Sequence, residues 1–208
     1  MKISMPKNKG FSTIEMMVAV ALFAMVMLMS AAAMVTLVNA NQKARSVKTA
    51  VDNLNFVVET ISRSLRVGSH YYCQPTTNSS GIVINHNTQN CPIDLNNSNS
   101  GGTYMGFSDR NGKLVFYRYN GSCIQRKVTN VDWVSAAPYV DDLNSGYDCI
   151  TPADITITRF RFYVYNTGIA SPKQPFVTLV ISGTVGAKQS TQTNFNLMTS
   201  VTQRIPQE

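Results

Sequence analysis

An uncharged apolar segment near the amino terminus constrains this chain more than any other feature. It runs for 23 residues from Met16 to Val38, and Ser30 and Thr36 are its only polar residues. A helix of that length rises about 34 Å, enough to cross a hydrocarbon core of about 30 Å. The first ten residues carry three lysines and no acid, so the positive-inside tendency keeps them in the cytoplasm. We therefore expect one membrane-spanning helix, followed by a domain outside the cytoplasm.

A single carboxylate stands at the start of this segment. Glu15 immediately precedes the uncharged residues, where an isolated charge in lipid costs free energy. A secretory signal peptide cleaved at Ala31-Ala32-Ala33 is one interpretation of the region, and a plain single-pass anchor is another. Neither interpretation gives Glu15 a role, so we expect a functional explanation for this residue.

The residues around Glu15 resemble the processing site of the type IV pilin and pseudopilin superfamily. The resemblance is carried by Lys9-Gly10-Phe11-Ser12-Thr13-Ile14-Glu15 and the uncharged segment that follows. It implies that a prepilin peptidase cuts after Gly10 and that Phe11 becomes the methylated amino terminus. It also implies that Glu15, the fifth residue of the mature chain, pairs with the terminal ammonium of a neighbouring subunit and sets the register, because a buried carboxylate needs a partner.

Two further features bear on the kind of subunit. Many major pilins carry a proline near the middle of this helix, whereas residues 30–34 here contain neither proline nor glycine. Residues Asn53–Arg66, Thr156–Tyr165, Phe176–Gly183 and Asn196–Arg204 resemble the minor pilin W and pseudopilin J classes. The resemblance implies a structural subunit near the filament tip, a minor pilin or minor pseudopilin of a type IV pilus-like or type II secretion-like filament. A major pilin of the shaft and a pilus-associated adhesin or DNA-uptake subunit are the alternatives.

The same resemblance implies where the chain resides and what it meets. Its partners are expected to be other pilin or pseudopilin subunits, prepilin peptidase and an inner-membrane assembly platform. Before assembly the chain would cross the cytoplasmic membrane once, with its head outside the cytoplasm, and it would then enter the filament.

The helix is expected to continue beyond the apolar segment. Apolar residues return at spacings of three and four in Ala44, Val47, Val51, Leu54, Val58, Ile61 and Leu65. The opposite face carries Lys48, Asp52, Asn55, Glu59, Ser62 and Arg66, so the stripe predicts an amphipathic helix that packs on a sheet of the same chain. We expect a leader in residues 1–10, a helix in 11–67 (membrane and filament core in 11–38, amphipathic in 39–67) and a head in 68–208.

Beyond residue 70 the hydrophobic period changes to two, which predicts strands. They are expected at residues 81–84, 103–108, 113–119, 123–129, 154–166, 175–185 and 193–204. Asp109-Arg110-Asn111-Gly112 predicts a hairpin turn, and the Asn- and Ser-rich residues 85–102 predict a surface loop. A long helix packed on an antiparallel sheet is an α+β fold.

Four cysteines all follow the apolar segment, at Cys73, Cys91, Cys123 and Cys149. An even number in an exported domain favours two disulfides, and sequential pairing closes the shortest loops, so Cys73–Cys91 and Cys123–Cys149 are the favoured pairs. A zinc site that combines cysteines with His70 and His86 is a weaker alternative, because the usual Cys-x2-Cys spacing does not occur.

The remaining composition argues against nucleic acid binding and catalysis. The net charge is +7, but three of the basic residues lie in the leader and the others are scattered, so we do not expect nucleic acid as a partner. The sequence contains no Gly-rich phosphate loop, zinc-protease motif or nucleophile elbow, so we expect no enzyme activity and no cofactor. The acidic stretch Asp141–Asp148 is expected to be a solvated loop held by Cys149, with a calcium site as the alternative.

Overall fold

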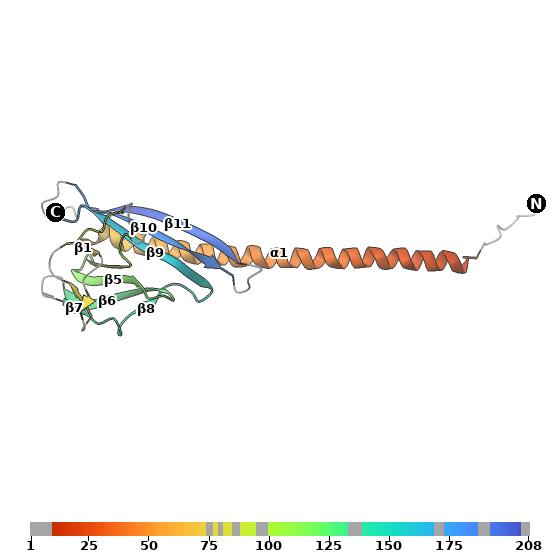
Figure 1. Ribbon diagram of the computed structural model, residues 1–208, viewed down its shortest axis with the longest axis horizontal. Helices are drawn as coiled ribbons and strands as arrows, with labels where there is room; N and C mark the ends of the chain where they lie inside the picture. The colour runs from red at the N-terminus through yellow and green to blue at the C-terminus, as the bar shows by residue number, and fades with distance from the viewer. Residues whose placement is uncertain are drawn as a thin grey trace, which may run out of the picture. The chain divides into compact units, whose positions relative to one another are not determined.

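The computed structural model describes residues 10–73, 77–78, 81–84, 88–94, 100–132, 139–168, 173–186 and 192–204. They form one helix and eleven strands, which confirms the predicted α+β fold (Figure 1). The helix, α1, runs without a break from Thr13 to Val67 over 55 residues, where the sequence predicted 11–67. The chain divides into two compact units, Met1–Arg45 and Ser46–Glu208, and α1 belongs to both.

The strands form three antiparallel sheets rather than the single predicted one. The first has the order β1-β4-β5-β6-β8, the second β11-β10-β9 and the third β2-β3-β7. The strand bounds are β1 Ser69–Cys73, β2 Thr77–Asn78, β3 Gly81–Ile84, β4 Tyr104–Ser108, β5 Lys113–Tyr119, β6 Ile124–Asp132, β7 Tyr139–Asp141, β8 Asp148–Cys149, β9 Ile155–Tyr165, β10 Phe176–Val185 and β11 Thr193–Thr202. The strands β1, β2, β7 and β8 were not predicted. The last three have only two or three residues, too few to show a period of two, and β1 buries three consecutive residues, so it shows no alternation.

The carboxy-terminal half of α1 packs against two of these sheets in one core. Its buried residues include Ala50, Leu54, Val57, Ile61 and Leu65, which join Phe107 and Tyr117 of the first sheet and Phe160, Phe162, Leu179 and Ile181 of the second. The predicted packing of this helix on a sheet of its own chain is therefore confirmed.

Most of the predicted stripe faces this core, since Leu54, Ile61 and Leu65 are buried in it and Val47 and Val58 pack against it, but the buried face is shifted at several positions. Val51 stays 43% exposed and Ala44 is exposed, whereas Val57 is buried. Ser62, expected on the solvent face, is also buried. The buried residues 50, 54, 57, 61 and 65 are also three or four apart and share 54, 61 and 65 with the predicted stripe, so periodicity cannot choose between Val57 and Val51. The position of the sheets makes that choice.

Two turns, one at the end of α1 and one in the predicted hairpin, have well-defined hydrogen bonds. The Gly68 amide donates to the Leu65 carbonyl (3.3 Å) just after α1 ends, and the buried Tyr71 hydroxyl donates to the Gly68 carbonyl (2.9 Å). This supplies a partner at a helix end, where carbonyls lack one. In the predicted hairpin, the Gly112 amide donates to the Asp109 carbonyl (3.0 Å), and Gly112 has a φ of 80°, which glycine adopts at little cost.

Candidate functional site

The expected processing residues lie just outside the start of α1. Gly10 and Phe11 precede the first helical residue and are exposed. A Cβ placed on Gly10 would meet no atom within 4 Å, so intrachain packing does not require a glycine at this position. Gly10 and Phe11 are therefore accessible to another protein.

Glu15 lies in the first turn of α1. The amides of Glu15 and Met16 donate to the Ser12 carbonyl at 3.1 and 3.2 Å, which puts Ser12 at the N-cap and Glu15 at the third helical position. Ser12-x-x-Glu15 matches a capping box, a signal that our sequence prediction did not use. A carboxylate here is favoured by the positive end of the helix dipole, yet none of the described residues forms an ion pair with Glu15.

The apolar segment after Glu15 exposes its side chains along its whole length. This helix is long and apolar enough to cross a membrane, and none of its most apolar 18-residue window is buried within the chain. The two hydroxyls in the segment are satisfied locally, since Ser30 donates to the Val26 carbonyl (2.9 Å) and Thr36 to the Ala32 carbonyl (3.0 Å). A continuous apolar surface of this size needs a cover of lipid or protein, and the charged residue Glu15 immediately precedes it.

The four cysteines form two disulfides in the head. Cys73 is bonded to Cys91 and Cys123 to Cys149, each with Cα atoms 5.8 Å apart, and these are the two pairs that the sequence favoured. The first bond holds part of the predicted surface loop, because the Cys91 amide donates to the Val164 carbonyl of β9 (3.0 Å). Since both sulfurs of this pair are bonded, they offer no thiolate to zinc. His86 and part of the loop, residues 85–87 and 95–99, lie outside the described residues.

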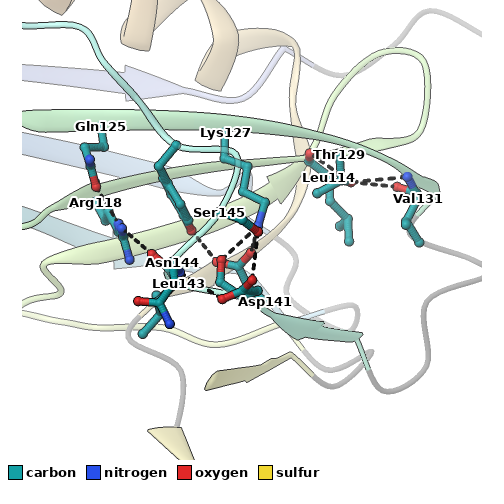
Figure 2. Close-up of polar contacts among 12 residues, drawn as sticks. Leu114, Arg118, Gln125, Lys127, Thr129, Val131, Asp141, Leu143, Asn144 and Ser145 are labelled. Carbon is teal, nitrogen blue, oxygen red and sulfur yellow. Dashed lines mark hydrogen bonds and ion pairs between the residues drawn. The ribbon is translucent and has the colours of Figure 1, made fainter. Parts of the chain in front are cut away.

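A buried carboxylate organises the acidic stretch of the head (Figure 2). Asp141 is fully buried, and its Oδ1 accepts from Lys127 Nζ at 2.7 Å. Its Oδ2 accepts from the hydroxyls of Tyr104 (3.0 Å) and Tyr147. Lys127 Nζ also donates to the Asp142 carbonyl (3.0 Å), so one ammonium ties two consecutive residues to β6. The prediction of a solvated loop is therefore wrong for Asp141, because the sheet supplies an internal cation.

The Asp141 carboxylate is surrounded by the Lys127 ammonium and by neutral tyrosine hydroxyls that donate hydrogen bonds to it. Burial raises the pKa of the Tyr104 and Tyr147 hydroxyls, with Asp141 adding to the effect, so both remain neutral donors. Arg118 lies 3.7 Å from the centre of the Tyr147 ring and donates to the Leu143 carbonyl (2.6 Å). Every Asp141 oxygen thus has a partner, and no group of three or more metal-ligating side chains occurs within the described ranges.

The comparisons with known proteins bear on the amino-terminal site. The family model described as the prokaryotic N-terminal methylation motif matches residues 5–31, which include Gly10, Phe11 and Glu15. No curated protein and no solved structure matches the chain. The match confirms the resemblance drawn from residues 9–15 and the uncharged segment. The matched motif therefore supports a type IV pilin-like subunit, of the type IV pilin and pseudopilin superfamily.

Proposed function

We propose that this chain is a minor pilin or minor pseudopilin of a type IV pilus-like or type II secretion-like filament. The observation that carries the proposal is the methylation motif leading directly into an uncovered apolar helix with a single acid at its start. In this role residues 1–10 are a removable leader, residues 11–38 form the membrane and filament core, residues 39–67 support the head and residues 68–208 form it.

Prepilin peptidase acts between Gly10 and Phe11 in this proposal. Both residues are exposed and precede the helix, which is the state that a peptidase requires of its substrate. Cleavage creates a new amino-terminal ammonium on Phe11, four residues before Glu15, and that residue is then methylated.

Glu15 recognises the terminal ammonium of a neighbouring subunit. Transfer of an isolated carboxylate into an apolar filament core is costly, and an opposite charge with good geometry offsets that cost. A subunit displaced along the axis would leave two unpaired charges in this core. The pair therefore favours one axial register over the others.

A minor role is supported by the absence of proline from Phe11 to Val67 and by the resemblance of the last strands to minor pilin W and pseudopilin J. The abundance of the chain separates this role from that of a major pilin. Sheared filaments should contain it as a small fraction of their protein, whereas a chain that forms most of the filament would be the shaft subunit.

The proposed location follows from the charge of the leader and the cysteines of the head. Three lysines hold the leader in the cytoplasm, and two disulfides suit a head in an oxidising compartment. The inner-membrane assembly platform then receives the subunit from the membrane. The superfamily of this motif is structural, and we propose no catalytic activity for this chain.

The substitution Glu15→Gln tests the proposed role of the Glu15 charge in filament assembly. Glutamine keeps the capping-box pattern but removes the charge. We expect intact mass to show a mature chain that begins at methylated Phe11 in wild type and variant alike. Recovery of the variant in sheared filaments should fall by tenfold or more, because losing one partner of a buried ion pair costs about 3–5 kcal/mol.

The matched variants assign the cause of any loss. Glu15→Ala removes both charge and cap and should behave like Glu15→Gln, whereas Ser12→Ala removes the side chain of the cap alone and should assemble well. Normal recovery of Glu15→Gln would contradict the register role. A mature chain that begins after Ala33, or one that retains its leader, would contradict the whole proposal.

A further inference from the structure

One edge of the three-stranded sheet β11-β10-β9 is open. The strand β11 pairs with β10 at ten consecutive positions, from Thr193 opposite Val185 to Thr202 opposite Phe176, without a bulge. Among the described residues no strand pairs with its other side (Figure 1). A row of main-chain donors and acceptors is therefore presented along a straight strand of ten residues.

This edge lacks the features that usually prevent strand addition. Natural edge strands are short, bulged or covered, or they carry charges and prolines. The sequence of β11, TNFNLMTSVT, contains no charged residue and no proline, and the strand is about twice the common length. Its solvent face bears Asn196, Met198 and Ser200, and Met198 is 71% exposed.

The opposite edge of the same sheet, β9, is protected, so the two edge strands of one sheet can be compared directly. Val164 of β9 exchanges main-chain hydrogen bonds with Cys91 at 3.0 and 3.1 Å. Phe162 does the same with Gly102 at 2.7 Å in both directions. The pairing of β9 with β10 also shifts register between Ser182 and Gly183. The chain therefore closes one edge of this sheet with its own loops and leaves the other unprotected.

An apolar groove follows the open edge. It has a volume of about 210 Å³ and lies between α1 and the strands β10 and β11. It is lined by Asn55 and Val58 of α1, Leu179 and Ile181 of β10, and Leu197, Met198 and Thr199 of β11. Val51, one helical turn before Asn55 on α1, is 43% exposed. Side chains alternate between the two faces of a strand, so a strand added to β11 would direct every second side chain toward this groove.

We propose that β11 accepts a strand from a different pilin-type subunit of the filament. The partner segment is extended, uncharged and apolar at alternate positions, because the main-chain edge requires a strand and the groove requires apolar side chains. A helix could fill the groove but could not pair with the edge. The inference rests on the proposed function, since a minor subunit is scarce and its neighbour is therefore a different chain.

Photo-crosslinking of the full chain in its own filaments tests the contact directly. A benzophenone amino acid replaces Met198, and the matched control replaces Val128, which is 46% exposed on β6. We expect position 198 to give an adduct with another pilin-type subunit, identified by mass spectrometry, and position 128 to give none.

A charge on the edge tests whether the contact matters for assembly. In Met198→Lys the charged side chain should prevent another strand from pairing with β11, as lysines on natural edge strands do. Recovery in filaments should therefore fall by about tenfold. Asn196→Lys, on the same exposed face, should act alike, and Val128→Lys should assemble normally. Unchanged thermal unfolding of all three variants would show that the head remains folded.

The outcomes separate this inference from the proposed function. If wild-type chain is processed and enters filaments, yet position 198 gives no adduct and both edge lysines assemble normally, the strand contact is wrong and the filament role stands. An adduct only with a second copy of this chain would also overturn the inference. If the wild-type chain is never processed and never enters filaments, the proposed function itself fails.

Discussion

The head and the amino-terminal segment differ in how each provides a charge partner for a carboxylate in apolar surroundings. Asp141 in the head is fully buried and has Lys127, Tyr104 and Tyr147 as partners within the same chain. Glu15 lies at the start of the uncharged apolar segment, but none of the described residues forms an ion pair with it. The head supplies its own counter-charge, whereas the acid of the amino-terminal segment finds its partner in another chain only in the role that we propose.

The same contrast holds for apolar surface. One continuous helix contributes Leu54 and Ile61 to a core closed by strands of the head, and it exposes nearly all of residues 16–38. Burial of apolar area is the main driving force for folding and for association. The head therefore uses this force to fold, and the segment retains it for membrane insertion and assembly.

The largest expected effect comes from breaking the charge pair of the head. In Lys127→Met the buried Asp141 loses its ammonium, which should destabilise the head by about 3–5 kcal/mol in denaturant unfolding of the detergent-solubilised chain. Adding Asp141→Asn should recover part of the loss, because the amide oxygen still accepts from the tyrosines.

The matched control for this pair lies on the surface of α1. Arg63 and Glu59 form an ion pair at 3.0 Å with exposed side chains, so Arg63→Met should change stability by at most about 1 kcal/mol. Equal effects of Lys127→Met and Arg63→Met would contradict the claim that burial makes the Asp141 pair important.

A second test compares two leucines on the same helix. Leu54 is 1% exposed and Leu28 is 74% exposed. Leu54→Ala should destabilise the head by about 2–5 kcal/mol, because it leaves a cavity in the core. Leu28→Ala should change unfolding of the detergent-solubilised chain by less than about 0.5 kcal/mol. A similar loss for both would mean that the exposed segment contributes to the fold of the head.

The smallest expected effect is the pH dependence due to Asp142. Hydrogen bonds from the Asn144 amide, and then from the Ser145 hydroxyl, lower the pKa of Asp142 below its usual 3.8. The folded state favours the carboxylate, so this stabilisation is present above pH 3.8 and is lost as pH falls through the lower pKa of the folded state. Thermal unfolding should therefore show a difference between wild type and Asp142→Asn at neutral pH that shrinks in acid. A difference independent of pH would contradict this cause.

Local sequence determined the amino-terminal part of the protein, through the end of α1. The order of Gly10, Phe11, Glu15 and an uncharged segment identified the superfamily, because processing and membrane insertion act on a short linear stretch. The absence of proline and the three- and four-residue spacings predicted a helix to residue 67, and α1 ends there. These features depend on neighbours along the chain, which the sequence displays directly.

Tertiary structure decided what depends on residues far apart in the sequence. Tyr104, Lys127 and Asp141 meet only because β4, β6 and β7 belong to sheets that pack together, so no local pattern marked Asp141 as buried. The choice of Val57 over Val51 for the core and the open edge of β11 also depend on where the sheets lie. A residue's own sequence sets its chemistry and its period, whereas burial is a property of the surfaces that the folded chain brings together.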